Sequence, residues 1–269
     1  MITALIAAAI AASPAPAPAA EAPLHEARPA IWVVNDQDTI IYLFGTFHAL
    51  DGKSAWFNEQ VKTTFGASSE LVLETLVPQA PKAIAAPAFS PRAMRAQPVG
   101  PFAGSASFLS TSKAVMSAGR SQGMSTSHGA DAVLREAAEE LGKPVVGLET
   151  FEFQLGMFSR LPGATPPKDA AAAARDRAAM AAVLNHLQAA WNRGDIESFT
   201  PMLNQMRTGS PQSYKLLFND RNGRWAQWIA HRLQQPGVVF VAVGAGHLAG
   251  ADSVQNKLAL LHVRSQRIN

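Results

Sequence analysis

Two segments of the chain share a pattern that can deliver a reactive side chain to the edge of a sheet. The apolar run TIIYLF is followed by Gly45 and, three positions later, by His48. The apolar run VVFVAV is followed in the same way by Gly244 and His247. A glycine at the end of a strand lets the backbone turn sharply or approach a ligand closely, and open α/β sheets bind ligands at the carboxyl ends of their strands. The pattern therefore predicts two imidazoles at one edge of a sheet, with Gly45 and Gly244 beside a bound group.

Two further apolar runs end in a glutamate. LVL leads into Glu74, and VVGL leads into Glu149. If these four strand ends lie on one edge of one sheet, two imidazoles and two carboxylates converge there. That set suits a divalent metal ion such as Mn, Co, Fe or Zn, with one carboxylate left to act as general base on a bound water. The same residues also suit a metal-free site in which a histidine is the base and a glutamate orients it. A lone histidine of this kind is more often a hydrogen-bonded core residue, whereas the doubled pattern favours a functional site.

The composition excludes several classes of protein. The chain has 269 residues, 48% of them hydrophobic and 16% charged, so it can bury the core of one large domain. The formal net charge is only +3 and no basic cluster is interleaved with aromatic residues, which argues against nucleic acid as a partner. Cysteine is absent, so disulfides, thiolate nucleophiles and cysteine-held metal centres are excluded. We expect a peptide or small-molecule substrate as the partner.

The N-terminal segment has the composition of a secretion signal. Residues 2–12 are almost wholly apolar, yet they fall short of the roughly 20 residues that span a bilayer. They resemble the apolar region of a signal peptide, although no Lys or Arg follows Met1; a plain Ala/Pro tail is the alternative. We expect a signal peptide over 1–20, an Ala/Pro-rich linker over 21–30 and a periplasmic or secreted bacterial protein. No other segment reaches transmembrane length.

The rest of the chain, 31–269, has the pattern of one mixed α/β domain. IWVV and TIIYLF, separated by NDQD, predict a β-hairpin. Helices are expected over about 54–66, 130–143, 168–207 (with a break near 192–195) and 211–233. Residues 78–108 are rich in Pro, Ala and Ser and predict a variable insertion. The predicted fold is therefore a central mixed β-sheet flanked by helices, with two half-repeats that each carry a strand and a GxxH motif.

Arg221, in the segment DRNGRW, is the remaining candidate for the site. A guanidinium there can clamp a carboxylate or stabilise an oxyanion. The alternative is a structural ion pair with Asp220 or Glu149. Asp131 lies at the start of a predicted helix, where its charge suits the positive end of the helix dipole, and we expect a capping role for it. Trp225 is expected in the core.

Six pieces of the sequence carry a family resemblance. They are LFGTFHAL, LVLETL, GADAVLREAAEELGKPVVGLETFEFQL, AAWNRGDIESF, DRNGRWAQWI and VFVAVGAGHLAG. In this order, and spread over most of 31–260, they resemble the TraB/GumN family, which includes GumN-like proteins, pheromone-shutdown proteins and the animal Tiki proteases. The pair GTFH and GAGHL, with GLETFEFQL between them, is specific as a set. The chain departs from the family pattern at 78–108, which bears on substrate range, and in lacking a glycine before the last strand.

The resemblance implies a fold related to erythromycin esterases and haem-binding ChaN-like proteins, and for some members a metal-dependent peptidase activity. By this resemblance His48, His247 and Glu74 would hold a divalent metal ion. Glu74 or Glu149 would carry the proton of a bound water, and Arg221 would assist charge development on the substrate carbonyl. The alternatives are a non-enzymatic protein that binds haem, a small ligand or a polysaccharide-export partner, and a family member that has lost its activity.

Overall fold

The computed structural model describes residues 24–76, 106–161 and 167–269, with only the backbone given for 106–112. A six-stranded sheet forms its centre, with the strands in the order β6-β5-β7-β3-β2-β8. The strands are β2 (Ile31–Asn35), β3 (Thr39–Thr46), β5 (Glu70–Thr75), β6 (Val145–Glu149), β7 (Gly237–Gly244) and β8 (Gln266–Arg267). A separate two-stranded sheet joins β1 (His25–Glu26) to β4 (Ser54–Ala55). The predicted signal peptide over 1–20 and most of the predicted insertion over 78–108 lie outside the described residues.

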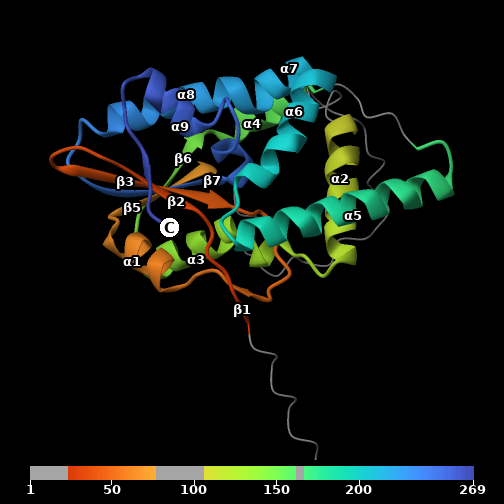
Figure 1. Cartoon of the computed structure of the whole chain (residues 1–269), viewed down its shortest axis with the longest axis horizontal. Helices are drawn as coiled ribbons and strands as arrows, with labels where there is room; N and C mark the ends of the chain where they lie inside the picture. The colour runs from red at the N-terminus through yellow and green to blue at the C-terminus, as the bar shows by residue number, and fades with distance from the viewer. Residues whose placement is uncertain (1–23, 77–105, 162–166) are drawn as a thin grey trace, which may run out of the picture.

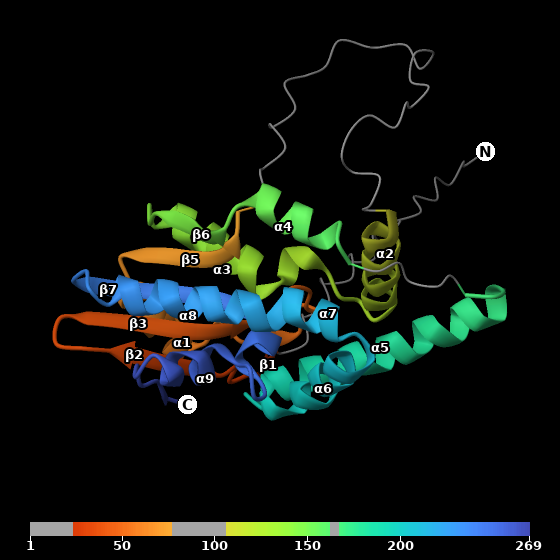
Figure 2. The ribbon, with the colours of Figure 1, turned by 90° about the horizontal axis from the view of Figure 1, so that it is seen from above.

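Helices cover both faces of the sheet, which confirms the predicted α/β class. They are α1 (Glu59–Ala67), α2 (Ala106–Ser121), α3 (Ala130–Glu140), α4 (Phe151–Phe158), α5 (Ala170–Asn192), α6 (Thr200–Gly209), α7 (Pro211–Tyr214), α8 (Asp220–Arg232) and α9 (Val254–Leu260). Figure 1 shows α8 and α9 on one face of the sheet and α1 and α3 on the other. Figure 2 shows α5 extending beyond the end of the sheet, where α2 packs against it. In the part of the chain that the structure describes, no helix has the length and apolar character needed to cross a membrane.

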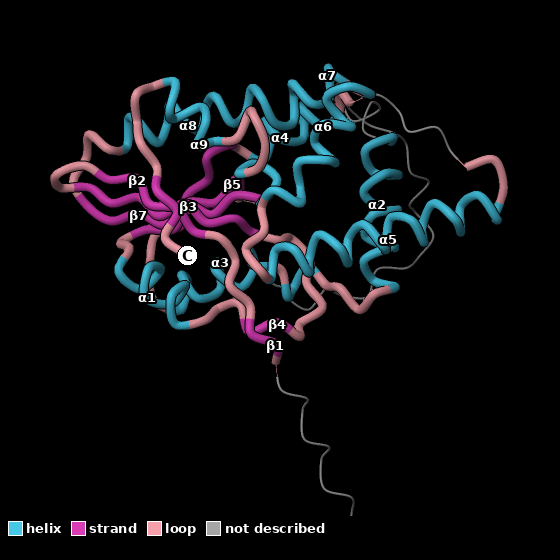
Figure 3. The backbone as a smooth tube through the Cα atoms, in the orientation of Figure 1, coloured by secondary structure: helices cyan, strands magenta, loops and turns pink. Residues whose placement is uncertain are grey.

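The strand pairing brings the two GxxH motifs side by side. β3 and β7 are parallel neighbours, and their register sets Gly45 opposite Val243 and Thr46 opposite Gly244. β5 pairs in parallel with β7 and with β6, while β2 and β8 add an antiparallel edge. Figure 3 shows the strands gathered in the centre with the helices around them. The predicted β-hairpin of β2 and β3 is confirmed. Because β6, β5, β7 and β3 are parallel, their carboxyl ends meet at one edge of the sheet.

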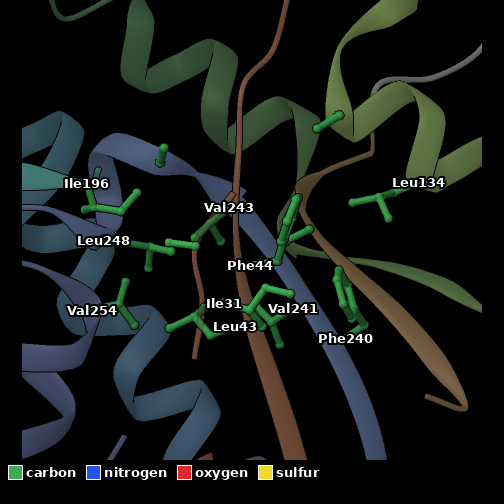
Figure 4. Packing of buried hydrophobic residues seen from close by; sticks show 14 of the residues in the cluster. Ile31, Leu43, Phe44, Leu134, Ile196, Phe240, Val241, Val243, Leu248 and Val254 are labelled. Carbon is green, nitrogen blue, oxygen red and sulfur yellow. The ribbon is translucent and has the colours of Figure 1, made fainter. Parts of the chain in front are cut away.

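The core follows from the long apolar runs of the central strands. Strands buried on both faces carry near-continuous apolar sequence, and Leu43, Phe44, Phe240 and Val241 are all fully buried. Figure 4 shows these side chains on β3 and β7 pointing to both sides of the sheet. The indole Nε1 of Trp191 donates to the backbone oxygen of Gly45 at 2.7 Å, so α5 is fixed to the end of β3.

The helix boundaries refine the expectations from the sequence. The first predicted helix begins at residue 59, because residues 54–55 pair with β1 and the Asn58 side chain caps the helix by accepting from the N–H of Val61. The predicted break near residue 194 is confirmed: Gly194 has a φ of +69°, and Asp195 accepts from the N–H of Ser198 at the next turn. The predicted helix 211–233 is interrupted by a π-helical turn over Lys215–Asn219.

The two ends of the domain also differ in detail from the expectation. Residues 24–30, the last part of the predicted linker, belong to the fold: His25 and Glu26 form β1, and the small side chains of Ala27 and Ala30 are buried in the core. At the other end, β8 forms without a preceding glycine. His262 adopts a φ of 60° in the turn between α9 and β8, a conformation that glycine adopts at lower cost.

Candidate functional site

The site lies at the carboxyl end of the parallel strands, where the register places Gly244 between two functional side chains. The N–H of Gly244 donates to Glu74 Oε1 at 2.7 Å. A Cβ on Gly244 would lie 3.1 Å from Glu74 Oε1 and 3.1 Å from His48 Nε2, so the missing side chain permits this close approach. Gly45 has a different role: a Cβ there would lie 3.3 Å from Ala245 Cα and 3.3 Å from Leu248 Cδ1, and Gly45 does not line the cavity at the site.

The guanidinium of Arg221 joins the other predicted residues. Its Nη2 donates to Glu74 Oε2 at 2.7 Å, and its Nε donates to Glu149 Oε2 at 2.9 Å. Its Nη1 lies 3.2 Å from His247 Nε2. Of the two ion pairs considered for Arg221, the one with Glu149 forms, while Asp220 pairs with Lys215. The arginine is therefore the centre of a buried group that contains both predicted glutamates and one predicted histidine.

His247 is buried and neutral. Its Nδ1 lies 2.6 Å from Asn222 Oδ1, and its ring makes tilted contacts with the rings of Phe218 and Trp225, at centroid distances of 4.8 and 4.5 Å. The Asn222 amide nitrogen donates to two backbone carbonyls, so its oxygen is the atom that faces the histidine and accepts the Nδ1 proton. Burial lowers the pKa of His247 to about 3, with a further lowering from Arg221 against an opposing effect of Glu74. The lone pair on Nε2 consequently faces Arg221 and Glu74.

His48 lies in the opposite kind of environment. Its side chain is 62% exposed, and its Nδ1 lies 2.6 Å from Asp131 Oδ2. The other oxygen of that carboxylate, Oδ1, accepts from the hydroxyl of Thr46 at 2.8 Å. The Asp131 carboxylate raises the pKa of His48 to about 9, against an opposing effect of the partial enclosure of the ring. His48 and Asp131 therefore form a charged pair at the open end of the site.

Glu74 stays ionised between these two histidines. Burial would raise the pKa of its carboxyl group, but its neighbours His247, Arg221 and His48 outweigh burial. The hydrogen bond from the N–H of Gly244 acts in the same direction. The pKa of Glu74 is consequently held well below its usual range.

A cavity of about 630 Å³ opens at this end of the sheet. His48 and His247 both line it, together with Thr46 and the backbone of Gly244 and its neighbours. Glu74, Glu149 and Arg221 lie behind these residues and do not line the cavity. The two histidines of the repeated motif thus open into one pocket, with the charged group packed beneath it.

Three residues of the site could not be assigned to it from the sequence: Asp131, Thr46 and Asn222. Asp131 does lie in the first turn of α3, as expected, but it makes no capping hydrogen bond and contacts His48 instead. Its neighbour Gly129 makes the contact possible, because a Cβ there would collide with the backbone oxygen of His48. The signal for Asp131 was its place in the family-like piece beginning GAD. Asn222, next to Arg221 in the sequence, carried no signal of its own.

The donor atoms fit a divalent metal ion in part. Both histidines anchor Nδ1 on an oxygen and turn Nε2 toward the site, which is the outer hydrogen bond typical of metal-binding histidines. His247 Nε2 lies 3.7 Å from Glu74 Oε1. Over the described ranges, however, no three His, Asp or Glu side chains converge as a metal-binding group. An ion held there would have to replace the contact between Arg221 and His247.

The comparisons with known proteins agree with the arrangement of motifs. Residues 30–102 and 93–260 match the TraB/PrgY/gumN family. Searches of the curated proteins and of the solved structures found no match. The family match covers both GxxH motifs, both glutamates and Arg221. The chain therefore belongs to the TraB/PrgY/gumN family.

Proposed function

We propose that this protein is a metal-dependent hydrolase that acts on a peptide or a related small-molecule substrate in the pocket. The observation that carries the proposal is that both motif histidines open into one cavity while an oxygen acceptor fixes the Nδ1 of each ring. Histidines held in this way offer Nε2 as a ligand or as a base. The family resemblance adds the expectation of peptidase activity.

His48, His247 and Glu74 are the residues that would hold the metal ion. When bound, the ion would supply a water of lowered pKa and a positive charge for the scissile carbonyl. His247 suits the role because its pKa of about 3 leaves Nε2 unprotonated at neutral pH. Glu74 suits it because its carboxylate remains ionised.

The chain's own groups would support hydrolysis around that centre. Asp131 holds the Nδ1 of the exposed His48 ring, so that its Nε2 is left to bind the ion at the pocket. The Arg221 guanidinium lies beneath the pocket, bonded to Glu74 and next to His247, and its positive charge would favour negative charge on a substrate carbonyl oxygen. Glu149 accepts from Arg221 and Arg224 and is nearly inaccessible, so we assign to it the holding of Arg221 and give proton transfer to Glu74.

The test combines metal binding with cleavage. Purified protein supplied with Mn or Co should retain the metal and cleave members of a peptide library, and a chelator should abolish cleavage. His48→Ala and His247→Ala should each abolish metal retention. His231→Ala is the matched control, because His231 is an exposed histidine on α8 outside the site. Unchanged metal retention in both site variants would overturn the metal assignment, and no cleavage under any metal would overturn the hydrolase.

The apolar lining of the pocket favours ligand binding without catalysis as the second candidate. An absorbance scan of the protein mixed with haem addresses the haem form of that candidate. A Soret band together with no peptide cleavage would favour binding over hydrolysis.

Export to the periplasm, or secretion, is part of the proposal through the signal-like N-terminus. Cell fractionation of the full chain tests it. Protein found only in the cytoplasmic fraction would contradict export.

A further inference from the structure

The cavity beside the two histidines has walls of flexible apolar side chains. Residues from four helical elements and the loop after α2 meet there: Met116, Met124, Leu184, Leu187, Met202 and Phe218. Methionine fills irregular space and adapts to ligands of varied shape because its side chain is unbranched and flexible. The volume of about 630 Å³ falls within the roughly 300–1,000 Å³ of small-molecule sites. The walls therefore suit a flexible apolar chain.

One face of α2 forms a wall of the cavity, and this wall carries an arginine. Met116, Gly119 and Arg120 are spaced as neighbours on one helix face and all line the cavity. A Cβ on Gly119 would lie 3.6 Å from Met124 Cβ and 3.7 Å from Leu184 Cδ1, so the helix packs closely here. This face of α2 therefore places Arg120 at the cavity, beside the apolar wall.

Arg120 is a cation that lines the cavity and has no acidic partner among the residues that the structure describes. Among the described residues its guanidinium has no ion pair and no hydrogen bond, and the residue is exposed. None of the described residues that line the cavity is Asp or Glu. An arginine that meets no carboxylate from its own wall is free to bind one from a ligand, in the paired geometry that guanidinium and carboxylate prefer.

We propose that the pocket binds a molecule with an apolar aliphatic chain and a carboxylate, with the chain against the methionine and leucine walls and the carboxylate on Arg120. As a statement about substrate class this rests on the proposed hydrolase: the substrate would be an amide or ester that carries such a chain and its bond would lie near His48. The binding itself does not depend on catalysis. A fatty acid and the C-terminus of an apolar peptide share this chemistry.

The test measures binding of laurate to the full chain by isothermal titration calorimetry, below the critical micelle concentration. Dodecanol and dodecyltrimethylammonium have the same chain with a neutral and a positive head. We expect laurate to bind at least tenfold more tightly than dodecyltrimethylammonium. Shortening the chain to decanoate should weaken binding about tenfold, because each methylene removed loses about threefold to fourfold in affinity.

Charge reversal on α2 separates the role of Arg120 from a general effect of charge. Arg120→Glu should weaken laurate binding at least tenfold and strengthen dodecyltrimethylammonium binding, with dodecanol unchanged. Lys113→Glu is the matched control, because it makes the same change of charge at an exposed position of the same helix that does not line the cavity. Laurate should bind this variant as it binds the wild type.

Three results would overturn the inference: binding of neither laurate nor N-acetyl-tetraleucine, equal binding by wild type and Arg120→Glu, or an equal loss in Lys113→Glu. Laurate has no scissile amide or ester, so these results are independent of turnover. Laurate binding through Arg120 without any peptide or ester cleavage would leave the inference standing and remove the hydrolase. A parallel titration with N-acetyl-tetraleucine decides the source of the carboxylate: either ligand binding through Arg120 supports the inference, and the tighter one identifies the source.

Discussion

The two histidines of the repeated motif have the same local sequence and opposite environments. The side chain of His48 is 62% exposed and hydrogen-bonded to a carboxylate, whereas that of His247 is 7% exposed and hydrogen-bonded to a neutral amide. The pKa of His48 is raised to about 9 and that of His247 is lowered to about 3. One ring is therefore a cation at neutral pH in the absence of a bound metal, while the other is a neutral acceptor.

The difference lies in what packs against each strand end. After β3 the chain leaves the sheet as an open loop, and His48 meets Asp131 at the start of α3. After β7 it enters a 3-10 turn over Ala245–Leu248 that lies under α8, so His247 is enclosed by Asn222 and two aromatic rings. A repeated motif thus fixes where a side chain emerges, and the partner element fixes its protonation. The two environments push the pKa values of the two histidines apart, as in active sites where one titratable group acts as an acid and another as a base.

The largest expected effect on stability comes from removing Arg221, the buried cation that the carboxylates of Glu74 and Glu149 share. Arg221→Gln should destabilise the fold by about 3–5 kcal/mol, because the carboxylates of Glu74 and Glu149 lose a buried partner. The free energy of unfolding in urea measures the loss. Arg224→Gln is the matched control, since it removes a half-exposed arginine from the same Glu149 and should cost less than about 1 kcal/mol. Equal losses in the two variants would contradict the central place given to Arg221.

Much of the fold and part of the site could be predicted from the sequence. Strand-end glycines, apolar runs and the rule for parallel sheets suffice to place His48, Glu74 and His247 at one edge. Asp131 could not be assigned, because an acid in the first turn of a helix has the same sequence pattern whether it caps that helix or reaches across to another loop. Asn222 could not be found either, since its contact with His247 depends on how α8 packs over β7.

Asn222→Asp should make the environment of His247 resemble that of His48. A carboxylate on Nδ1 would raise the pKa of His247 above about 3, by the same interaction through which Asp131 acts on His48. The change should also cost about 1–3 kcal/mol, because the amide donations of Asn222 to the carbonyls of His247 and Asp252 are lost. Histidine Cε1 resonances followed by NMR through a pH titration report the pKa. A value that stays near 3 in the variant would show that burial alone governs this ring.

The smallest expected effect on stability comes from the converse change at the exposed end. Asp131→Asn should bring the pKa of His48 down from about 9 toward its ordinary 6.5, because the carboxylate is the main cause of the shift. A raised pKa in the folded state stabilises the fold fully below pH 6.5, and that contribution is lost as the pH rises through about 9. The exposure of His48 limits it to less than about 1 kcal/mol.

Because the stability effect is small, an NMR titration of His48 tests this prediction more sharply than unfolding does. Urea unfolding at pH 6 and pH 10 is the second measurement. Glu139→Gln serves as the control, since it neutralises a different carboxylate of α3 that pairs with Arg135. We expect the pKa of His48 to fall in Asp131→Asn alone, and the wild type to lose its small stability advantage over that variant at pH 10. A similar fall in both variants would mean that the helix as a whole, and not the contact with Asp131, sets the charge of His48. The contrast between the two motif histidines would then arise from long-range electrostatics and not from their two partners.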